Sequence, residues 1–172
     1  TEILQADFFF IVDTTGSMSG SLSGVQAGLT SVIIPGISAV VPDAWFGVGY
    51  HDDFPVFPYG GGCCGAGGVP HDVAFRLSQA MTPDVSLAQA GVNRLDLGYG
   101  NDGPESQVEA LYQTITGEGL GTWVGASPGC LEGGFGYPCF RRGSIPVIIN
   151  VTDAPYHNGT GLGGGDPYAG MV

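Results

Sequence analysis

The strongest constraint on the fold is an unbroken apolar run at residues 8–12, Phe-Phe-Phe-Ile-Val, which is followed at once by polar side chains. A run of this length, rich in aromatic and β-branched residues, is typical of a strand buried on both faces in a helix-covered parallel sheet. Asp13, Thr15 and Ser17 then alternate along the chain, and Gly16 permits a tight turn between them. Ligands bind at strand ends in open α/β sheets. One carboxylate and two hydroxyls at such an end predict a Mg²⁺ site rather than a zinc or copper site.

Three motifs in order resemble those of the von Willebrand factor A domain. Residues 13–17, Asp-Thr-Thr-Gly-Ser, match the Asp-x-Ser/Thr-x-Ser signature of its metal-ion-dependent adhesion site. Residues 101–106, Asn-Asp-Gly-Pro-Glu-Ser, resemble the second metal loop of bacterial members, and residues 147–153 resemble the strand that ends in the third-loop aspartate. Residues 46–49 and 52–55 are similar to the hemicentin-like domains of bacterial lipoproteins and adhesins.

The resemblance implies a role for each site residue. Thr15 and Ser17 would ligate Mg²⁺ directly, with Mn²⁺ or Ca²⁺ as alternatives, while Asp13 and Asp153 would reach the ion through water. Asp102 stands where the second loop supplies its ligand, and ahead of Pro104 it is equally suited to cap a helix. Neutral direct ligands leave the ion electrophilic, so that Asp or Glu of a partner protein can take the open position.

A second polar cluster follows the next predicted strand. Asp52 and Asp53, beside His51, could hold a second cation, or they could cap a turn. His157 follows the third metal loop and could line the rim of the ligand surface, or it could be an ordinary loop histidine.

Hydrophobic periodicity predicts strands that alternate with helices. We expect strands at 8–12, 45–50 and 146–151, and an antiparallel edge strand at 73–77. A helix after the metal loop should be kinked at Pro35 and Gly36. A second helix should start with Thr82 as its cap and end near Arg94, and a third should span 104–116. The apolar face of the first helix is expected to be Leu22, Val25, Leu29, Val32 and Ile33, and that of the third Val108, Leu111, Tyr112 and Ile115.

This alternation predicts a doubly wound, Rossmann-like, mainly parallel α/β sheet flanked by helices. The resemblance implies two more strands and their helices after the third metal loop, and the sequence stops before them. We therefore expect a von Willebrand A-type fold without its final elements, which would be truncated, proteolysed or supplied by another chain. The absence of an initial Met and of a signal-like segment indicates a mature or excised fragment.

The length of 172 residues fits one domain with glycine-rich insertion loops at about 55–70 and 117–143. These loops hold the four cysteines, which favours disulfides and an oxidising compartment, and hence a secreted or cell-surface protein. Of the three pairings, Cys130 with Cys139 is preferred because it closes a short loop. Cys63 and Cys64 would then form a vicinal bridge or pair with another chain.

The charge balance excludes several partners. Sixteen acidic residues against four arginines and no lysine give a formal net charge of -12, which repels nucleic acid and anionic lipid. No apolar run in the sequence approaches the roughly 20 residues that a membrane span needs.

Catalysis is not expected. Aspartyl-phosphate chemistry and Walker-type phosphate binding both need a lysine, which the chain lacks. Residues 16–20, Gly-Ser-Met-Ser-Gly, misplace the serine for a Gly-x-Ser-x-Gly elbow. Two hypotheses remain: a metal-dependent adhesion module that captures an acidic side chain, or a structural subunit of an extracellular assembly in which the metal only stabilises the domain.

Overall fold

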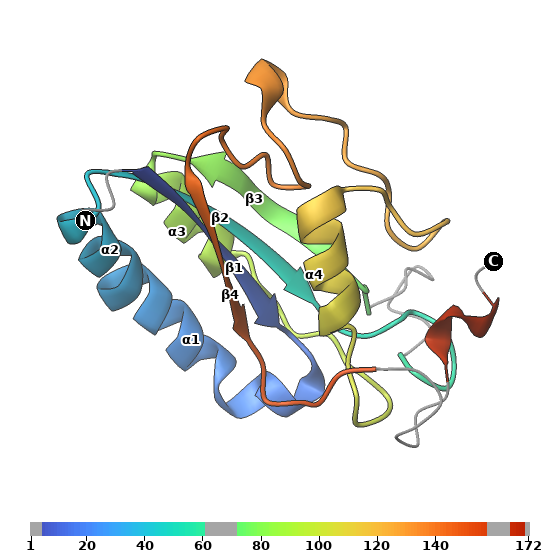
Figure 1. Ribbon diagram of the computed structural model, residues 1–172. Coiled ribbons are helices and arrows are strands. Elements are labelled where there is room, and N and C mark those ends of the chain that lie inside the picture. The colour runs from blue at the N-terminus through green and yellow to red at the C-terminus, as the bar shows by residue number, and fades with distance from the viewer. Residues whose placement is uncertain (1–4, 61–71, 158–165, 171–172) are drawn as a thin grey trace.

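The computed structural model describes residues 5–60, 72–157 and 166–170, which form an α/β fold (Figure 1). A mixed four-stranded open sheet has the strand order β3-β2-β1-β4. β2 and β4 run parallel to β1 on either side of it, whereas β3 runs antiparallel to β2. The strands predicted at 8–12, 45–50 and 146–151 are confirmed. The bounds are β1 (Gln5–Asp13), β2 (Asp43–His51), β3 (Arg76–Thr82) and β4 (Ile145–Val151).

β1 lies in the middle of the sheet because its apolar run can be buried on both faces. Phe10 and Val12 belong to the core on one face, and Phe9 and Ile11 belong to the core on the other. All four side chains are fully buried. This burial fixes the position of Asp13, which ends the strand.

Helices flank both faces of the sheet (Figure 1). The core on one face includes residues of α1, α2 and α3, and the core on the other includes Ala110 of α4. The bounds are α1 (Leu22–Gly28), the π-helical turn η2 (Leu29–Ile33), α2 (Ile34–Val40), α3 (Val85–Asn93) and α4 (Gln107–Thr116), with short 3-10 helices η1 (Gly16–Gly20), η3 (Leu131–Gly133) and η4 (Pro167–Gly170).

The first helix buries the predicted face only as far as Leu29, and Val25 packs against the same core. Leu22, Leu29 and Ile34 are buried, whereas Val32 and Ile33 are exposed. The π-helical turn η2 lies just before Pro35, whose ring and missing N–H disturb an α-helix. Its extra residue rotates the buried face, so the spacing from Leu29 to the next buried residue is five instead of three or four.

The prediction for the buried face of α4 was wrong for three of its four residues, and only Leu111 packs against the core. Val108, Tyr112 and Ile115 are exposed, while Gln113 and Thr114 are fully buried. The Gln113 amide donates to Glu109 and accepts from the Gly119 N–H, and the Thr114 hydroxyl donates to the Ala110 carbonyl. Their hydrogen bonds are thus satisfied inside the fold, which removes most of the cost of burying them.

Helix α4 starts at Gln107 rather than at residue 104, and its N-cap is Ser106, so Asp102 does not cap this helix.

Two other predicted boundaries differ from the structure. The antiparallel edge strand starts at Arg76 rather than at residue 73, because Val73 pairs with Asp52 in the loop after β2: its carbonyl accepts from the Asp52 N–H, and its N–H donates to the Asp52 carboxylate. The cap of α3 is Asp84, whose carboxylate accepts from the Ser86 N–H at 2.8 Å, and not Thr82. Arg94 directly follows the helix, as predicted.

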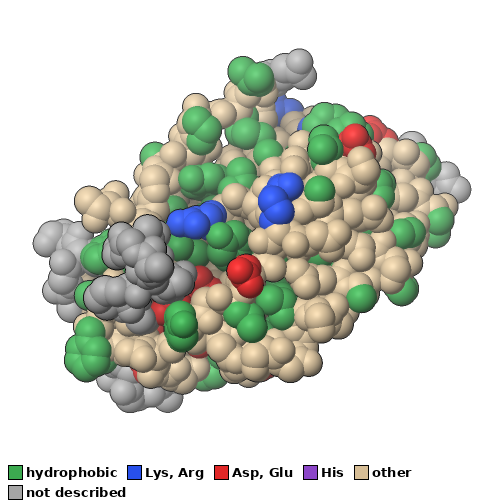
Figure 2. Space-filling model, turned by 180° about the vertical axis from the view of Figure 1, so that it is seen from behind, with side chains coloured by type: hydrophobic (Ala, Val, Ile, Leu, Met, Phe, Trp, Pro, Cys, Tyr) green, Lys and Arg blue, Asp and Glu red, His purple; other side chains and the backbone are tan. Residues whose placement is uncertain are grey.

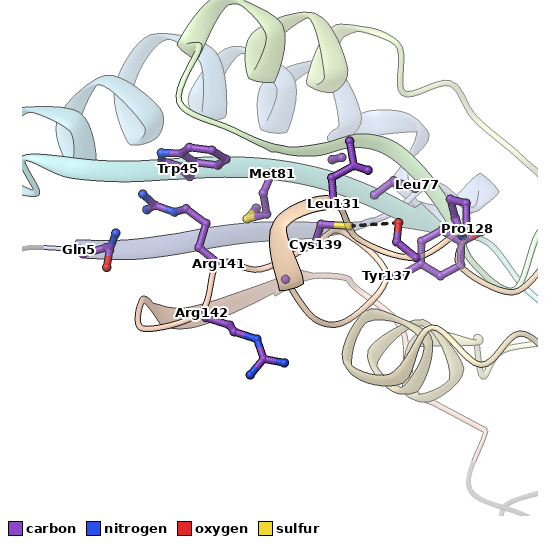
Figure 3. A pocket seen from close by; sticks show the side chains of 13 residues that line it. Gln5, Trp45, Leu77, Met81, Pro128, Leu131, Tyr137, Cys139, Arg141 and Arg142 are labelled. Carbon is purple, nitrogen blue, oxygen red and sulfur yellow. Dashed lines mark hydrogen bonds between the residues drawn. The ribbon is translucent and has the colours of Figure 1, made fainter.

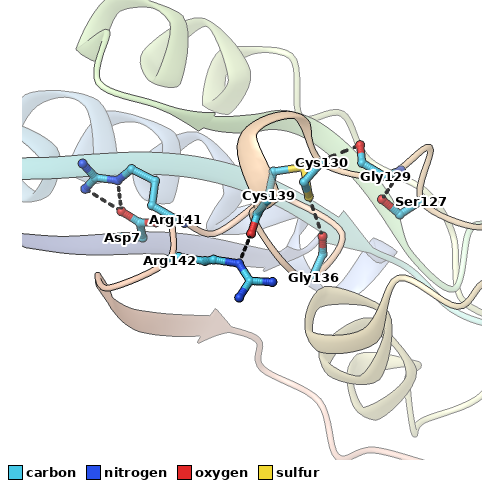
Figure 4. Close-up of a disulfide and its surroundings, with 9 residues drawn as sticks. Asp7, Ser127, Gly129, Cys130, Gly136, Cys139, Arg141 and Arg142 are labelled. Carbon is cyan, nitrogen blue, oxygen red and sulfur yellow. Dashed lines mark hydrogen bonds and ion pairs between the residues drawn. A yellow bond between two sulfur atoms is a disulfide. The ribbon is translucent and has the colours of Figure 1, made fainter.

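The insertion loop at 117–143 carries the preferred disulfide, Cys130–Cys139 (Figure 4). The loop leads into Arg141, whose guanidinium lies 2.6 Å from the buried carboxylate of Asp7 on β1 and 2.6 Å from that of Asp43. Cys63, Cys64 and most of the other insertion loop lie outside the described residues.

Removing the disulfide in a Cys130→Ser/Cys139→Ser variant is expected to lower the free energy of unfolding by about 2–3 kcal/mol, because a bridge between residues nine apart restricts a short loop of the unfolded chain. Urea unfolding at equal protein concentration measures the change. An unchanged midpoint and slope would show that this loop unfolds separately from the sheet.

The helical stretch Leu22–Val40 is long and apolar enough to cross a membrane by length and composition, and it is the one such stretch among the described residues. A single match of this kind is weak evidence. Leu22, Leu29 and Ile34 pack on the sheet in this structure.

Candidate metal centre

Polar side chains gather where the three parallel strands end. The arrows of β1, β2 and β4 point to the same end of the sheet in Figure 1. Asp13 ends β1, Asp53 lies two residues after β2, and Asp153 lies two residues after β4. The sequence-predicted site is therefore brought to one edge by the parallel strands.

Asp13 organises this edge through its two carboxylate oxygens. Oδ1 accepts from the N–H and the hydroxyl of Thr15 at 2.9 and 2.6 Å, and Oδ2 accepts from the Thr152 hydroxyl at 2.7 Å. Asp13 is fully buried. It thus holds both the loop after β1 and the loop after β4.

Thr15 and Ser17 form the part of the site that can reach an ion directly. Their hydroxyl oxygens are 3.1 Å apart, and the Ser17 hydroxyl donates to Asp153 Oδ1 at 2.7 Å. Adjacent oxygens in octahedral Mg²⁺ coordination, at about 2.1 Å from the ion, are separated by about 3.0 Å. Thr15 is buried and Ser17 is exposed. The pair therefore fits two adjacent Mg²⁺ ligands with solvent access on one side.

Glu105 is a site residue that the sequence analysis did not single out, although it lies in the motif at 101–106. It is almost fully buried, and its Oε2 accepts no hydrogen bond from the described residues. A Cβ on Gly100, which has φ +67°, would lie 2.9 Å from Glu105 Oε1 and 3.3 Å from the Thr15 methyl group. Burial, followed by the charges of Asp53, Asp13 and Asp102, raises the pKa of Glu105 to about 10. A cation placed beside Thr15 would oppose that shift.

Asp52 has a structural role in this arrangement. It accepts from the Thr14 hydroxyl at 2.5 Å and from the Val73 N–H at 3.1 Å, so both carboxylate oxygens tie neighbouring loops together. Burial raises the pKa of Asp52 to about 7. Of the two hypotheses for this residue, these contacts favour the turn-stabilising role.

Asp53 and Asp102 lie close to each other, and His157 contacts both. His157 Nε2 is 3.1 Å from Asp53 Oδ1 and 3.5 Å from Asp102 Oδ1. The contacts that the structure shows for Asp102 are thus with these residues and not with Thr15 or Ser17. His157 is buried and is an integral part of the acidic cluster, a position that its place in the sequence did not reveal.

His51, at the end of β2, is fully buried and points its Nδ1 to the Asp52 carbonyl at 3.1 Å. Burial lowers its pKa, which keeps the imidazole neutral near pH 7.

A cavity of about 710 Å³ lies at the other end of the sheet, where β1 and β2 begin (Figure 3). Trp45, Leu77 and Met81 form its apolar wall, and Arg141 stacks over the Trp45 ring at 4.3 Å. Arg141 is bound to Asp7 and Asp43, and Arg142 donates to the Gly133 carbonyl, so both guanidinium groups already have partners.

The face in Figure 2 carries few charged groups, as expected for a chain with 12% charged residues.

The sequence matches no model of a known protein family and no curated protein.

Proposed function

We propose that this chain is a metal-dependent protein-binding module of the von Willebrand factor A type, with a doubly wound sheet and a Mg²⁺ site at Thr15 and Ser17. The observation that supports the proposal most is the 3.1 Å separation of the two hydroxyl oxygens. Both hydroxyls are hydrogen-bonded to carboxylates, those of Asp13 and Asp153. The central position of β1 in the sheet is consistent with it.

The residues fit Mg²⁺ by the chemistry of their donors. Thr15 and Ser17 supply neutral hydroxyl oxygens. The Thr15 hydroxyl donates a hydrogen bond to Asp13, and the Ser17 hydroxyl donates one to Asp153. Glu105 adds a buried carboxylate beside Thr15. Bound Mg²⁺ would supply an electrophilic centre at the surface, and Mn²⁺ or Ca²⁺ could replace it.

The partner would be a protein that presents an Asp or Glu side chain. Its carboxylate would complete the coordination on the side where Ser17 is exposed to solvent. The acidic chain would add no other attraction for such a group, so binding would depend strongly on the metal. The disulfide Cys130–Cys139 is weakly consistent with the oxidising, extracellular setting of an adhesion module.

The alternative is a structural subunit of an extracellular assembly. The exposed apolar side chains of α4 and of the first helix, which include Tyr112, Ile115, Val32 and Val40, favour this second function. In that case the metal would stabilise the domain without binding a partner.

Metal-dependent stabilisation tests the proposal. Mg²⁺ at about 100 times its dissociation constant should add about 2.7 kcal/mol, which corresponds to a rise in melting temperature of about 5–10 °C. The rise should saturate with Mg²⁺, disappear with chelator and be absent from Asp13→Ala. Melting is followed by circular dichroism with Mg²⁺, Mn²⁺ and Ca²⁺ in turn.

Asp96→Asn, which removes an exposed carboxylate, is the control and should keep the full Mg²⁺ response. If the wild-type protein is folded and none of the three metals changes its melting temperature, metal-dependent adhesion is ruled out. A metal response without metal-dependent capture of acidic ligands would favour the structural subunit.

A further inference from the structure

Asp53, Asp102 and His157 form a cluster that the proposed adhesion site does not use, in which Asp53 and His157 are buried and Asp102 is partly exposed. Each residue comes from a different segment: the loop after β2, the loop before α4 and the loop after β4. One ligand atom from each lies within 4.8 Å of the other two. Residues about 50 positions apart along the chain are thus brought to one point by the fold.

Among the described residues, no arginine reaches the cluster, and His157 is the one side chain in it that can carry a positive charge. Asp53 is fully buried, and Asp53 Oδ2 and Asp102 Oδ1 accept no hydrogen bond from the described residues. The chain has no lysine, and its four arginines all lie within the described ranges. Their contacts lie elsewhere: Arg76 with Tyr50, Arg94 with Ser78, Arg141 with Asp7 and Asp43, and Arg142 with Gly133. A buried carboxylate oxygen that accepts no hydrogen bond is costly, and a bound cation would remove that cost.

The orientation of His157 suits a metal ligand. Its ring packs edge-on against Phe54 and Tyr59, with centroid distances of 5.7 and 5.0 Å, and these contacts direct Nε2 toward the two carboxylates. The distances from Nε2 to Asp53 Oδ1 and Asp102 Oδ1 are 3.1 and 3.5 Å. Ligands about 2.0–2.1 Å from a tetrahedral ion are about 3.3–3.4 Å apart, a value that lies between these two distances.

We propose that Asp53, Asp102 and His157 form a second divalent-cation site that prefers a first-row transition-metal ion, from Mn²⁺ to Zn²⁺. One imidazole nitrogen with two carboxylates suits these ions better than Mg²⁺, which prefers all-oxygen coordination. The hydroxyl site at Thr15 and Ser17 has the opposite preference. The second site stands on its own contacts and does not depend on whether the hydroxyl site binds an ion.

Counting bound Mn²⁺ by electron paramagnetic resonance tests the proposal, because bound ions lose the signal of free Mn²⁺. The wild-type protein should bind two Mn²⁺ ions, while Asp53→Asn and Asp13→Ala should each bind one. In the wild-type protein, equimolar Zn²⁺ should displace the Mn²⁺ bound at Asp53, Asp102 and His157. A large excess of Mg²⁺ should displace the Mn²⁺ bound at Thr15 and Ser17.

His157→Gln separates the ligand role of the imidazole from a general loss of charge. The variant should bind Mn²⁺ at this site at least about 10-fold more weakly and should lose the preference for Zn²⁺. Asp96→Asn is the control and should bind both ions. Circular dichroism confirms that each variant is folded.

The outcomes distinguish the two sites. A single Mn²⁺ that is lost in Asp13→Ala and kept in Asp53→Asn overturns the second site and leaves the adhesion site intact. A single Mn²⁺ with the opposite dependence supports the second site and contradicts the first. Zinc preference that survives in His157→Gln, or no bound Mn²⁺ at all, overturns the second site.

Discussion

Replacing Arg141 by alanine is expected to lower the free energy of unfolding by about 3–5 kcal/mol, because it leaves a fully buried carboxylate without its cation. Asp7 is 0% exposed, and Arg141 reaches it through Nε at 2.8 Å and through its backbone N–H at 2.6 Å. The same guanidinium binds Asp43 and stacks on Trp45. One side chain therefore joins the starts of β1 and β2 to the insertion loop. Urea unfolding at pH 7 measures the loss.

Arg142→Ala is a matched control, since this neighbouring guanidinium is exposed and contacts the Gly133 carbonyl. Its effect should stay within about 0.5 kcal/mol. Adding Asp7→Asn to Arg141→Ala should recover part of the loss by removing the unpaired charge. A change below about 1 kcal/mol for Arg141→Ala would contradict this account of the buried ion pair.

Glu105→Gln is expected to have opposite effects on the metal-free and the metal-bound protein. Without metal, the folded protein keeps a proton on Glu105 from its ordinary pKa of 4.5 up to about 10, while the unfolded chain releases it. The stability of the wild type therefore falls as the pH rises through this range, by at most about 1.4 kcal/mol per pH unit. Glutamine has no proton to lose, so in chelator the variant should be the more stable protein at pH 8.

With Mg²⁺ the wild type should be the more stable protein, because the Glu105→Gln variant lacks the carboxylate beside Thr15. Its Mg²⁺ affinity should fall about 10- to 100-fold or more. Wild-type affinity should rise with pH, since the metal displaces the Glu105 proton. Urea unfolding at pH 5.5, 7 and 8.5, with chelator and with Mg²⁺, measures both effects. Equal metal affinity in the two proteins at every pH would show that Glu105 takes no part in the site.

The hydrophobic pattern predicted the parts of the fold that depend on local sequence. The run at 8–12 identified β1, and the polar residues after it identified Asp13, Thr15 and Ser17. The resemblance of residues 147–153 to a metal loop added Asp153. The hydroxyls and carboxylates of these four residues are hydrogen-bonded to one another in the structure. Parallel strands bring their ends together, so a sequence motif at each end is enough to predict this part of the cluster.

Residues whose positions depend on tertiary contacts could not be predicted in the same way. Gln113 is buried because Glu109 and Gly119 complete its hydrogen bonds, and periodicity alone favoured the apolar face of α4 that is exposed. The π-helical turn before Pro35 changes the helical period, which a regular helical pattern cannot represent. The contact of His157 with Asp53 spans 104 residues and leaves no local signal.

The parallel pairing of β1 with β4 has a mechanical consequence. The two strands are in register from Ala6 with Ile145 to Val12 with Val151, and Ser17 and Asp153 join the loops at their shared end. A partner held at this end would pull β1 and β4 in the same direction, along the strand axes. Because β1 and β4 would move together, the load would fall as shear on the β1–β2 ladder, whose hydrogen bonds would carry it together, whereas a sideways pull on an edge strand would open a ladder one hydrogen bond at a time. The architecture is therefore suited to resist tension applied through the candidate binding site.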